Sequence, residues 1–345
     1  MAKILVTGGT GFIGSHTVVE LQKQGFEVVI VDNLSNSSID VLSGIEKITG
    51  KRPIFENVDC VDYVSMDRLF EKHSNIAAII HFAASKAVGE SVDKPLLYYR
   101  NNLVSVINLL QLMPIHKVDN FVFSSSCTVY GQPDVLPVTE DAPIKVALSP
   151  YGNTKQIGEE IICDTLRSNP GTQSIILRYF NPIGAHASAE IGELPNGVPN
   201  NLLPFVTQTA IGLRKQLQVY GNDYDTPDGS CIRDYIHVVD LAKAHVIAVQ
   251  RMLDKKTKNQ VETFNLGTGR GLSVLEIIDT FEKVNEVKVP HKIVARREGD
   301  IEKVWADPSY ANNELGWIAT ETLEETLRSA WAWELNLAKR TKAEA

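Results

Sequence analysis

The chain has 345 residues, 43% of them hydrophobic and 22% charged, and its formal net charge is −8. This length predicts about two domains with a sizeable core. The negative balance argues against a nucleic-acid-binding surface, and no apolar run reaches the roughly 20 residues that span a membrane. Four cysteines lie far apart, the eight histidines show no metal-ligand spacing, and a strand pattern begins at Lys3. We therefore expect no signal peptide, no metal and a cytoplasmic location.

The first 180 residues alternate short β-rich runs with longer helical patterns. Each run is nearly all apolar, as is typical of parallel strands covered on both faces. The alternation predicts an α/β fold with a doubly wound, Rossmann-type parallel sheet. Helices are expected at His16–Gln24 and Pro150–Ser168. The expected strands are Ile4–Val6, Val28–Val31, Ile54–Glu56, Ala78–His81, Phe121–Ser124 and Ser174–Leu177.

The pattern loosens after Asn181. We expect a first domain over residues 1–180 and a smaller α/β domain over 181–345, with some segments returning to the first. Gly184–Pro204 is rich in Gly, Pro and Asn and predicts a long functional loop. The polar tail after Leu337 is expected to fray. Amphipathic helices are expected at Leu202–Leu213, Val239–Met252, Val274–Val287 and Leu323–Trp333.

A glycine-rich loop, Thr7–Gly14, joins the first strand to the first helix. Gly8, Gly11 and Gly14 permit a tight turn and a close approach of the backbone to a pyrophosphate, next to the partial positive charge of a helix N-terminus. Asp32 ends the second strand, where a carboxylate binds ribose hydroxyls and repels a 2′-phosphate. The spacing predicts a dinucleotide site that prefers NAD to NADP.

Tyr151 and Lys155 share one face of the helix that begins at Pro150. A neighbouring ammonium, together with a positive nicotinamide ring, is expected to lower the pKa of the tyrosine and favour a phenolate. Ser126 follows a strand at the carboxyl end of the sheet, where α/β proteins bind ligands. We expect Tyr151 to take a proton from a sugar hydroxyl, with Ser126 relaying it.

These motifs together resemble the UDP-glucose 4-epimerase family of the extended short-chain dehydrogenase/reductase superfamily, from residue 3 to about Trp333. The segments that carry the resemblance are TGGTGFIG (Thr7–Gly14), HFAASKAVGES (His81–Ser91), FSSSCTVYG (Phe123–Gly131), SPYGNTK (Ser149–Lys155), RYFNPIGAH (Arg178–His186), PNNLLP (Pro199–Pro204), RDYIHVVDLA (Arg233–Ala242) and RREGD (Arg296–Asp300).

The resemblance implies a residue-by-residue set of roles. Ser126, Tyr151 and Lys155 would be catalytic, and Lys155 would also hold the nicotinamide ribose. The implied cofactor, NAD, would contact Gly8, Gly11, Phe12, Ile13, Gly14, Asp32, Asn33, Leu34, Ser35, Asn36, Ser37, Asp59, Cys60, Phe82, Ala83, Ala84, Ser85, Lys86, Asn101, Ser126, Tyr151, Lys155 and Phe180. The UDP-sugar would contact Lys86, Ser126, Tyr151, Asn181, Asn201, Leu202, Tyr220, Arg233, Arg297, Asp300 and Val304.

The implied reaction is reversible inversion of carbon 4 of a UDP-hexose, through a 4-keto sugar that turns over while UDP stays anchored. Some residues depart from the family pattern. Ala84-Ser85 replaces a common Gly-Leu, Cys127 stands where Ala follows the serine, and Cys60 replaces a common Ile. These small changes bear on cofactor affinity and rate more than on the type of reaction.

Two other functions share part of this pattern. A sugar-nucleotide 4,6-dehydratase shares the fold, but that family carries Asp-Glu just after the serine or threonine, where this chain has Cys127 and Thr128. A non-catalytic NAD-binding scaffold need not keep the serine, tyrosine and lysine. Single members also have structural interpretations: Asn200-Asn201 as a helix cap, and Arg233-Asp234 as a surface pair.

The resemblance also implies a homodimer in which two helices, about Pro95–Met113 and Pro150–Ser168, pair across a two-fold axis. The first carries Leu103, Val106, Ile107 and Leu110, which could equally face the core. In the family, a small residue at the position of Val304 accompanies acceptance of N-acetylhexosamines, whereas tyrosine restricts the substrate to plain hexoses. Val304 could instead be core packing, and both interpretations stay open here.

Overall fold

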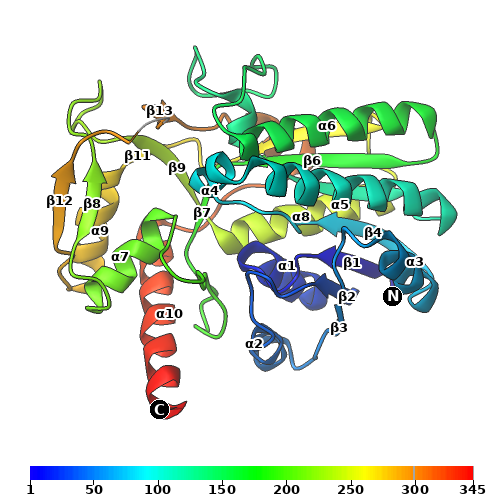
Figure 1. Cartoon of the computed structure of the whole chain (residues 1–345), viewed down its shortest axis with the longest axis horizontal. Coiled ribbons are helices and arrows are strands. Elements are labelled where there is room, and N and C mark those ends of the chain that lie inside the picture. Colours follow the sequence, from blue (N-terminus) through cyan, green and yellow to red (C-terminus); the bar gives the residue numbers. More distant parts are fainter. Residues whose placement is uncertain (298–299, 345) are drawn as a thin grey trace.

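Six apolar runs of the first half and one of the second form a single parallel sheet. The computed structural model describes residues 1–297 and 300–344, the last four by their backbone alone. Neighbouring strands follow the order β10-β6-β5-β4-β1-β2-β3, and Figure 1 labels β6, β4, β1, β2 and β3 of this sheet. The predicted α/β class with a Rossmann-type sheet is confirmed. The strands are β1 Lys3–Thr7, β2 Glu27–Asp32, β3 Ile54–Asn57, β4 Ile76–His81, β5 Asn120–Ser126, β6 Gln173–Tyr179 and β10 Val261–Leu266.

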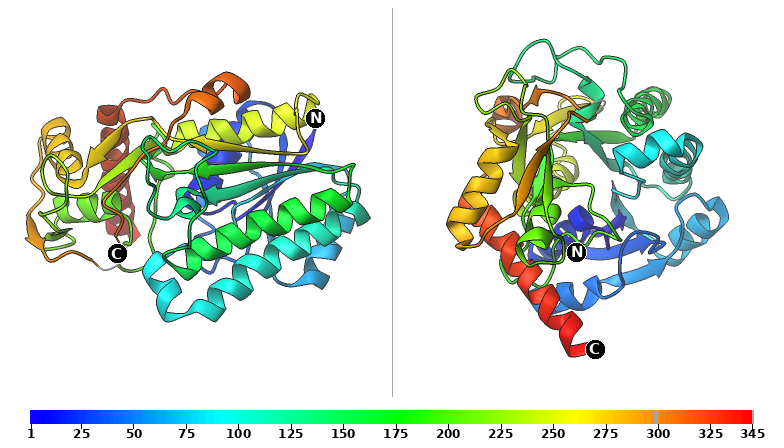
Figure 2. Two further views of the ribbon diagram at one scale, coloured as in Figure 1. Left: turned by 90° about the horizontal axis from the view of Figure 1, so that it is seen from above. Right: turned by 60° about the vertical axis from the view of Figure 1, so that its left-hand side comes forward.

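Helices cover both faces of this sheet, as Figure 2 shows with α8 on one side and α5 and α6 on the other. Alternate strand residues explain this: Ile4 and Val6 pack toward α1 and α8, whereas Leu5 packs toward α3, α5 and α6. The helices of this unit are α1 Phe12–Lys23, α2 Val41–Thr49, α3 Tyr63–Lys72, α4 Val88–Asp93, α5 Pro95–Ile115, α6 Pro150–Ser168 and α8 Val238–Leu253, with a short 3₁₀ turn at Cys127–Tyr130.

A smaller unit carries two further sheets. In one, β9 lies between β11 and β13 and also pairs with β7; in the other, β8 pairs with β12. α8 and β10 return to the large sheet, so residues after 181 contribute to both units. The elements are β7 Asn181–Ile183, α7 Leu202–Ala210, β8 Leu217–Tyr220, β9 Ile232–His237, β11 Gly271–Ser273, α9 Val274–Asn285, β12 His291–Val294, β13 Lys303–Val304, a π-helical turn Ala311–Leu315 and α10 Leu323–Glu344.

The start of α1 and the end of α10 differ most from the predicted bounds. α1 begins at Phe12 rather than His16, because Gly11 is extended and its carbonyl accepts the Ser15 N–H at 2.9 Å. α10 continues past the predicted end at Trp333 to Glu344, and within this extension Asn336 Nδ2 donates to the Ala189 carbonyl at 2.6 Å and Arg340 pairs with Glu190. The last helix is therefore fastened to the loop that follows β7.

Within residues 1–297 and 300–344, no helix is long and apolar enough to cross a membrane. In the same part of the chain, no three His, Cys, Asp or Glu side chains are grouped to hold a metal ion. Cys60 and Cys231 are buried, Cys127 and Cys163 are half-buried, and all four are free thiols.

Candidate active site

The glycine loop folds as its sequence predicts. Gly8 has a φ of +69°, and a Cβ there would lie 2.7 Å from the Ala83 nitrogen. A Cβ on Gly14 would lie 2.2 Å from the Gly8 carbonyl oxygen, so only glycine lets α1 pack this closely on the loop. Gly11 is the extended N-cap of α1, and neither a side-chain cap nor an acidic residue occupies the first turn. The helix N-terminus thus keeps its free N–H groups for an anion, and Phe12 and Ile13 lie in that first turn.

Asp32 is buried at the end of β2 and organises the loops around it. One carboxylate oxygen accepts the Thr10 N–H at 3.2 Å, and the other accepts the Leu34 N–H at 2.9 Å and the Ser37 hydroxyl at 3.0 Å. A carboxylate has about four acceptor positions. Asp32 therefore fixes the glycine loop to Asn33–Ser37 and keeps acceptor capacity for a ribose hydroxyl.

Residues that follow β3 contact the segment Asn33–Ser37. Asn33 donates its side-chain N–H to Asp59 at 3.1 Å, which joins the ends of β2 and β3. Cys60 is buried beneath, and burial raises the pKa of its thiol to about 12. Cys60 is thus a neutral packing group and not a reactive thiolate.

The segment Phe82–Lys86 follows β4 and is held by two neighbouring asparagines of α5. Asn101 donates to the Ser85 hydroxyl at 3.1 Å. Asn102, which sequence reasoning missed, accepts the Ser85 N–H at 2.8 Å and donates both to the Ser85 carbonyl and to Thr154 Oγ1 at 3.0 Å. Asn102 is buried and joins this segment to α6. The signal was present in the Asn-Asn pair, but sequence alone did not tell which of the two points inward.

Ser126 and Tyr151 meet at the carboxyl end of β5. Ser126 is buried, and its hydroxyl accepts the Thr128 N–H at 3.3 Å. Ser149 caps α6 by accepting the Gly152 N–H at 3.1 Å, which fixes the first turn that carries Tyr151. A hydrogen bond between Tyr151 and Ser126 lowers the pKa of the phenol, although burial has the larger effect. The two predicted proton-transfer groups are therefore adjacent.

The protein groups alone do not lower the pKa of Tyr151 as expected. Burial raises this pKa well above its usual range, and the nearby phenol of Tyr179 acts in the same direction. Lys155 directs its ammonium to the Ser124 carbonyl, with Nζ to oxygen at 2.7 Å, and its Nζ lies 5.9 Å from the Tyr151 ring centroid. Burial lowers the pKa of Lys155 to about 8, against the opposing effect of Glu159.

A buried charge network beneath the serine turn was also missed. Glu159 of α6 accepts the Ser125 hydroxyl at 2.5 Å and both Nε and Nη2 of Arg178, at 3.0 and 2.6 Å. Arg178 in turn donates to the Tyr130 hydroxyl at 3.0 Å, and Tyr130 donates to Asn265 at 2.7 Å. Removing either Glu159 or Arg178 would leave the other as a buried, unpaired charge. The network therefore fixes the serine turn relative to α6.

A second cluster lies on the smaller unit and unites four predicted UDP contacts. Arg297 Nη2 pairs with Asp300 at 2.6 Å, and Arg233 Nη2 lies 4.0 Å from the same carboxylate. The Arg297 guanidinium stacks over Tyr220, 5.4 Å from the ring centroid. Glu298 and Gly299 of the same RREGD motif lie outside the described residues. The two guanidinium groups are suited to phosphate oxygens.

The interpretation of Arg233-Asp234 as a surface pair is wrong. Asp234 is fully buried and accepts the N–H groups of Thr268 at 2.8 Å, Gly269 at 3.2 Å and Ala306 at 3.1 Å. It therefore ties β9 to the loops that follow β10 and β13. These three hydrogen bonds of Asp234 fix the position of the neighbouring Arg233 in the cluster.

The interpretation of Asn201 as a helix cap is also wrong. Asn201 stands at the N-cap of α7, but its side chain makes no capping bond. It donates instead to Glu193 Oε1 at 2.6 Å, and Lys86 Nζ lies 3.7 Å from the same oxygen. Sequence reasoning missed Glu193, one of two glutamates in a loop rich in glycine and proline. Leu202 follows in the first turn of α7.

Val304 contacts both the strand that carries Arg233 and the hydrophobic residues next to the serine turn. It is 2% exposed and pairs in register with Arg233 across β13 and β9. It packs in one hydrophobic cluster with Phe180 and Val129. Asn181 begins β7, directly after Phe180, and pairs with Tyr235. The predicted cofactor side and the predicted substrate side therefore meet at Val304 and Phe180.

Comparison with known proteins settles the family. The chain is 51% identical over 332 residues to UDP-glucose 4-epimerase of Dictyostelium discoideum, covering 96% of this chain and 95% of the relative. The chain belongs to the UDP-glucose 4-epimerase family. The broader family model that matches residues 5–330 is described as GDP-mannose 4,6 dehydratase.

Solved structures agree with this assignment. The UDP-glucose 4-epimerase from Stenotrophomonas maltophila, with bound NAD and formylated UDP-arabinopyranose, superposes with a TM-score of 0.95 at 48% identity, covering 99% of this chain and all of that one. The Bifidobacterium longum enzyme, in complex with NAD+ and UDP, has a TM-score of 0.92 at 48% identity, covering 97% and 98%.

The dehydratase chemistry suggested by the broader family lacks its acid–base pair here. Elimination of water needs an acid and a base after the serine, where this chain has Cys127 and Thr128. Burial raises the pKa of the Cys127 thiol to about 12, so that thiol stays neutral, and a threonine hydroxyl is no general base at neutral pH. The site therefore favours epimerisation over dehydration.

Proposed function

We propose that this chain catalyses the NAD-dependent, reversible inversion of carbon 4 of UDP-hexoses, interconverting UDP-glucose and UDP-galactose. One observation carries the proposal. The turn that follows Ser126 packs through Val129 against Phe180 and Val304, and Val304 pairs with Arg233 of the second cluster. A sugar beside the tyrosine and a diphosphate beside the arginines can thus be held at once. The family membership and the NAD and UDP complexes of its relatives support the same function.

The residues around the glycine loop fit NAD. The first turn of α1 keeps free N–H groups for a pyrophosphate, and Asp32 keeps acceptor capacity for a ribose hydroxyl. A 2′-phosphate would meet the Asp32 carboxylate, which favours NAD over NADP. When bound, NAD supplies the hydride acceptor and a positively charged ring beside Tyr151.

Tyr151 takes the proton of the 4-hydroxyl as carbon 4 is oxidised, and returns it when the carbon is reduced again. Ser126 is placed to relay that proton because it is hydrogen-bonded to the tyrosine. Burial opposes ionisation of Tyr151. We assign to the Lys155 ammonium, whose Nζ lies 5.9 Å from the ring centroid, the role of a cation that favours the phenolate.

Inversion requires the 4-keto sugar to present its opposite face while UDP stays fixed. Asn181, Asn201, Leu202, Tyr220, Arg233, Arg297 and Asp300 form the proposed UDP anchor. These residues come from five different segments of the smaller unit. The sugar itself is proposed to meet few side chains, chiefly Ser126, Tyr151, Lys86 and Val304. We extend the proposal to N-acetylated UDP-hexosamines, because valine at position 304 leaves the pocket without a phenol ring.

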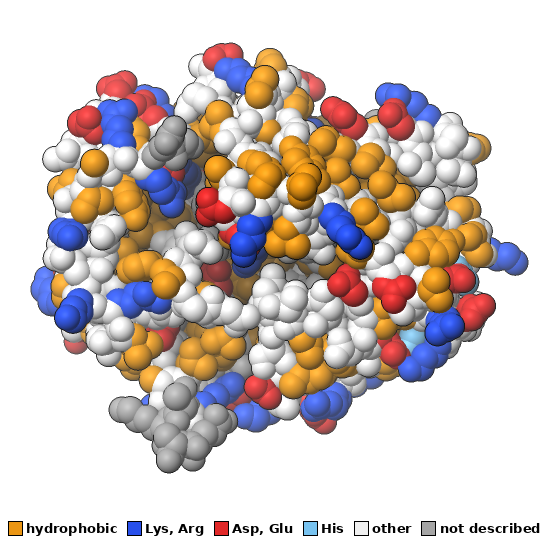
Figure 3. Space-filling view, viewed as in Figure 1, with side chains coloured by type: hydrophobic (Ala, Val, Ile, Leu, Met, Phe, Trp, Pro, Cys, Tyr) orange, Lys and Arg blue, Asp and Glu red, His pale blue; other side chains and the backbone are white. Residues whose placement is uncertain are grey.

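We propose a cytoplasmic homodimer joined through α5 and α6. On α5, Val106 and Leu110 face the core, but Leu96, Ile107 and Ile115 are 81%, 37% and 60% exposed. Figure 3 shows hydrophobic side chains gathered over the face formed by α4, α5 and α6. α5 is fastened to α6 by the Asn153 side chain, which donates to the Tyr99 hydroxyl at 2.7 Å. This apolar stripe supports pairing of two copies.

The function is tested with a panel of UDP-sugars incubated with the purified protein and analysed by product identity. UDP-galactose should yield UDP-glucose, and the reverse, without added cofactor. Formation of a 4-keto-6-deoxy sugar would indicate the dehydratase instead. Bound NAD without conversion of any sugar would indicate a non-catalytic protein.

A further inference from the structure

The loop between β7 and α7 is wedged between the two units. Ala185 and Gly192 form an antiparallel bridge. Ile191 packs in the core of the NAD-binding unit. A Cβ on Gly192 would lie 2.4 Å from the Trp333 ring, so this turn lies flat against α10. The segment Ala185–Gly192 is therefore held in place by both units.

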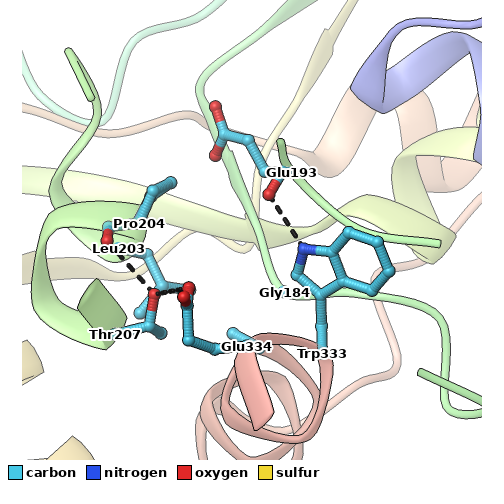
Figure 4. A pocket seen from close by; sticks show the side chains of 8 residues that line it. Gly184, Glu193, Leu203, Pro204, Thr207, Trp333 and Glu334 are labelled. Carbon is cyan, nitrogen blue, oxygen red and sulfur yellow. Dashed lines mark hydrogen bonds between the residues drawn. The ribbon is translucent and has the colours of Figure 1, made fainter. Parts of the chain in front are cut away.

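Glu193 directly follows this fixed segment. Its carbonyl oxygen accepts the Trp333 Nε1–H at 2.9 Å, which anchors its backbone to α10. Its side chain is directed the other way, as Figure 4 shows, with the carboxylate turned from the indole. The carboxylate accepts the Asn201 amide at 2.6 Å and lies 3.7 Å from Lys86 Nζ. One acid thus contacts a group on the segment after β4 and a group at the start of α7.

The asymmetry of burial shows which partner orients the other. The Glu193 side chain is 11% exposed, whereas that of Lys86 is 56% exposed. A long, exposed lysine has many rotamers, and a fixed carboxylate reduces that freedom before a ligand arrives. Asn201 lacks a capping bond, so Glu193 is the partner that orients its amide.

We propose that Glu193 is a positioning residue that holds Lys86 of the cofactor side and Asn201 of the UDP side in their binding arrangement. The inference rests on the proposed function, because Lys86 and Asn201 are its proposed ligand contacts. Glu193 acts through these two residues and is not itself a catalytic group. Its loss should therefore weaken the binding of UDP and UDP-sugars and leave the chemical step nearly unchanged.

The chain offers a matched control. Glu334 of α10 lines the same small pocket, is buried, and accepts the Thr207 hydroxyl at 2.8 Å (Figure 4). Glu193→Gln keeps an acceptor for Asn201 but removes the charge facing Lys86. Glu334→Gln removes a carboxylate from the same pocket whose hydrogen bond goes to Thr207. A general effect of losing a buried carboxylate would appear in both variants.

The test measures binding of UDP-glucose, pre-equilibrated with UDP-galactose, to the NAD-loaded protein by calorimetry, together with kcat and KM for UDP-galactose. Because Lys86 is a proposed sugar contact, Glu193→Gln should raise the Kd for the UDP-sugar and the KM by roughly three- to tenfold, with kcat within about twofold of wild type. Glu334→Gln should match wild type in all three. An unchanged Kd in Glu193→Gln, or an equal rise in both variants, would overturn the inference.

A double-mutant cycle with Lys86→Met supplies the second measurement. If Glu193 acts through Lys86, the double variant should bind the UDP-sugar little worse than Lys86→Met alone. Additive losses would contradict the coupling. Failure of the proposed function is distinguishable, since wild type would then not interconvert UDP-galactose and UDP-glucose, whereas failure of the inference leaves wild-type turnover intact.

Discussion

Lys155 donates a hydrogen bond from its buried ammonium to the carbonyl oxygen of Ser124, with a distance of 2.7 Å between the nitrogen and the oxygen. This bond holds the ammonium at the end of β5, where Nζ lies 5.9 Å from the Tyr151 ring centroid. Lys155 therefore acts on the tyrosine as a nearby charge. The Phe123 ring lies beneath the ammonium, 5.0 Å away, and helps to hold the cation in a buried place.

This arrangement predicts a fall in activity at alkaline pH. Burial lowers the pKa of Lys155 to about 8, so the lysine is charged below that pH and loses its proton above it. Because the phenolate of Tyr151 depends on that charge, kcat should decline as pH rises through about 8. Initial rates from pH 6.5 to 9.5 test this, with circular dichroism as the control for unfolding. A rate that stays flat up to pH 9.5 would contradict the assigned role.

The cofactor prediction concerns the identity of the bound nucleotide. Protein purified without added cofactor should release NAD, and no NADP, when it is denatured. Asp32→Ala should retain less, since removing one charge-assisted hydrogen bond costs about 1.5–3 kcal/mol, or roughly 10- to 100-fold in affinity. Enzymatic assay of the released nucleotide decides this. Finding NADP, or a strict need for free NAD, would sink the assignment.

The dimer prediction uses the exposed stripe of α5. Ile107→Glu should convert the protein to a monomer, because a charge would be buried against its copy across the two-fold axis. Ile318→Glu places the same charge at an isoleucine that is 61% exposed and lies off α5, and it should leave the dimer intact. Light scattering at micromolar concentration gives the answer. A monomeric wild type would reject the pairing.

The substrate-breadth prediction depends on Val304, which is buried beside Phe180 and Val129. Wild type should convert UDP-N-acetylglucosamine measurably, though more slowly than UDP-glucose. Val304→Tyr should suppress the acetylated substrate and spare the plain one, because an added ring occupies the space of the acetyl group. Initial rates on both sugars for both proteins test it. No turnover of the acetylated sugar by wild type would show that Val304 is only core packing.

Strands buried on both faces could be predicted from the sequence because each is a continuous apolar run. β10 was not predicted, because Glu262 and Asn265 interrupt its apolar run. Those polar groups are buried only because distant partners satisfy them: Arg251 makes two bonds to Glu262, at 2.7 and 2.9 Å, and Tyr130 donates to Asn265. Local pattern cannot reveal partners that tertiary packing brings together.

In the candidate site, too, some features could be predicted from the sequence and others depend on the fold. The motifs predicted which residues gather, such as Tyr151 with Ser126 and Arg297 with Asp300. They could not predict the direction of the Tyr151 pKa, because burial depends on the whole fold. Glu193 was missed for a similar reason, since its partner Lys86 lies on a different segment and only the folded loop brings them together.

The central claim is that Tyr151 moves the proton at carbon 4. The most direct measurement compares wild type, Ser126→Ala and Tyr151→Phe for conversion of UDP-galactose to UDP-glucose, alongside calorimetric binding of UDP. Tyr151→Phe should lose about 10²–10⁴-fold in kcat, as is typical when a general base is removed, and Ser126→Ala a smaller factor. The Kd for UDP should be unchanged in both, because the arginine cluster is untouched. Near-normal turnover by Tyr151→Phe, with the protein folded and NAD bound, would contradict the account.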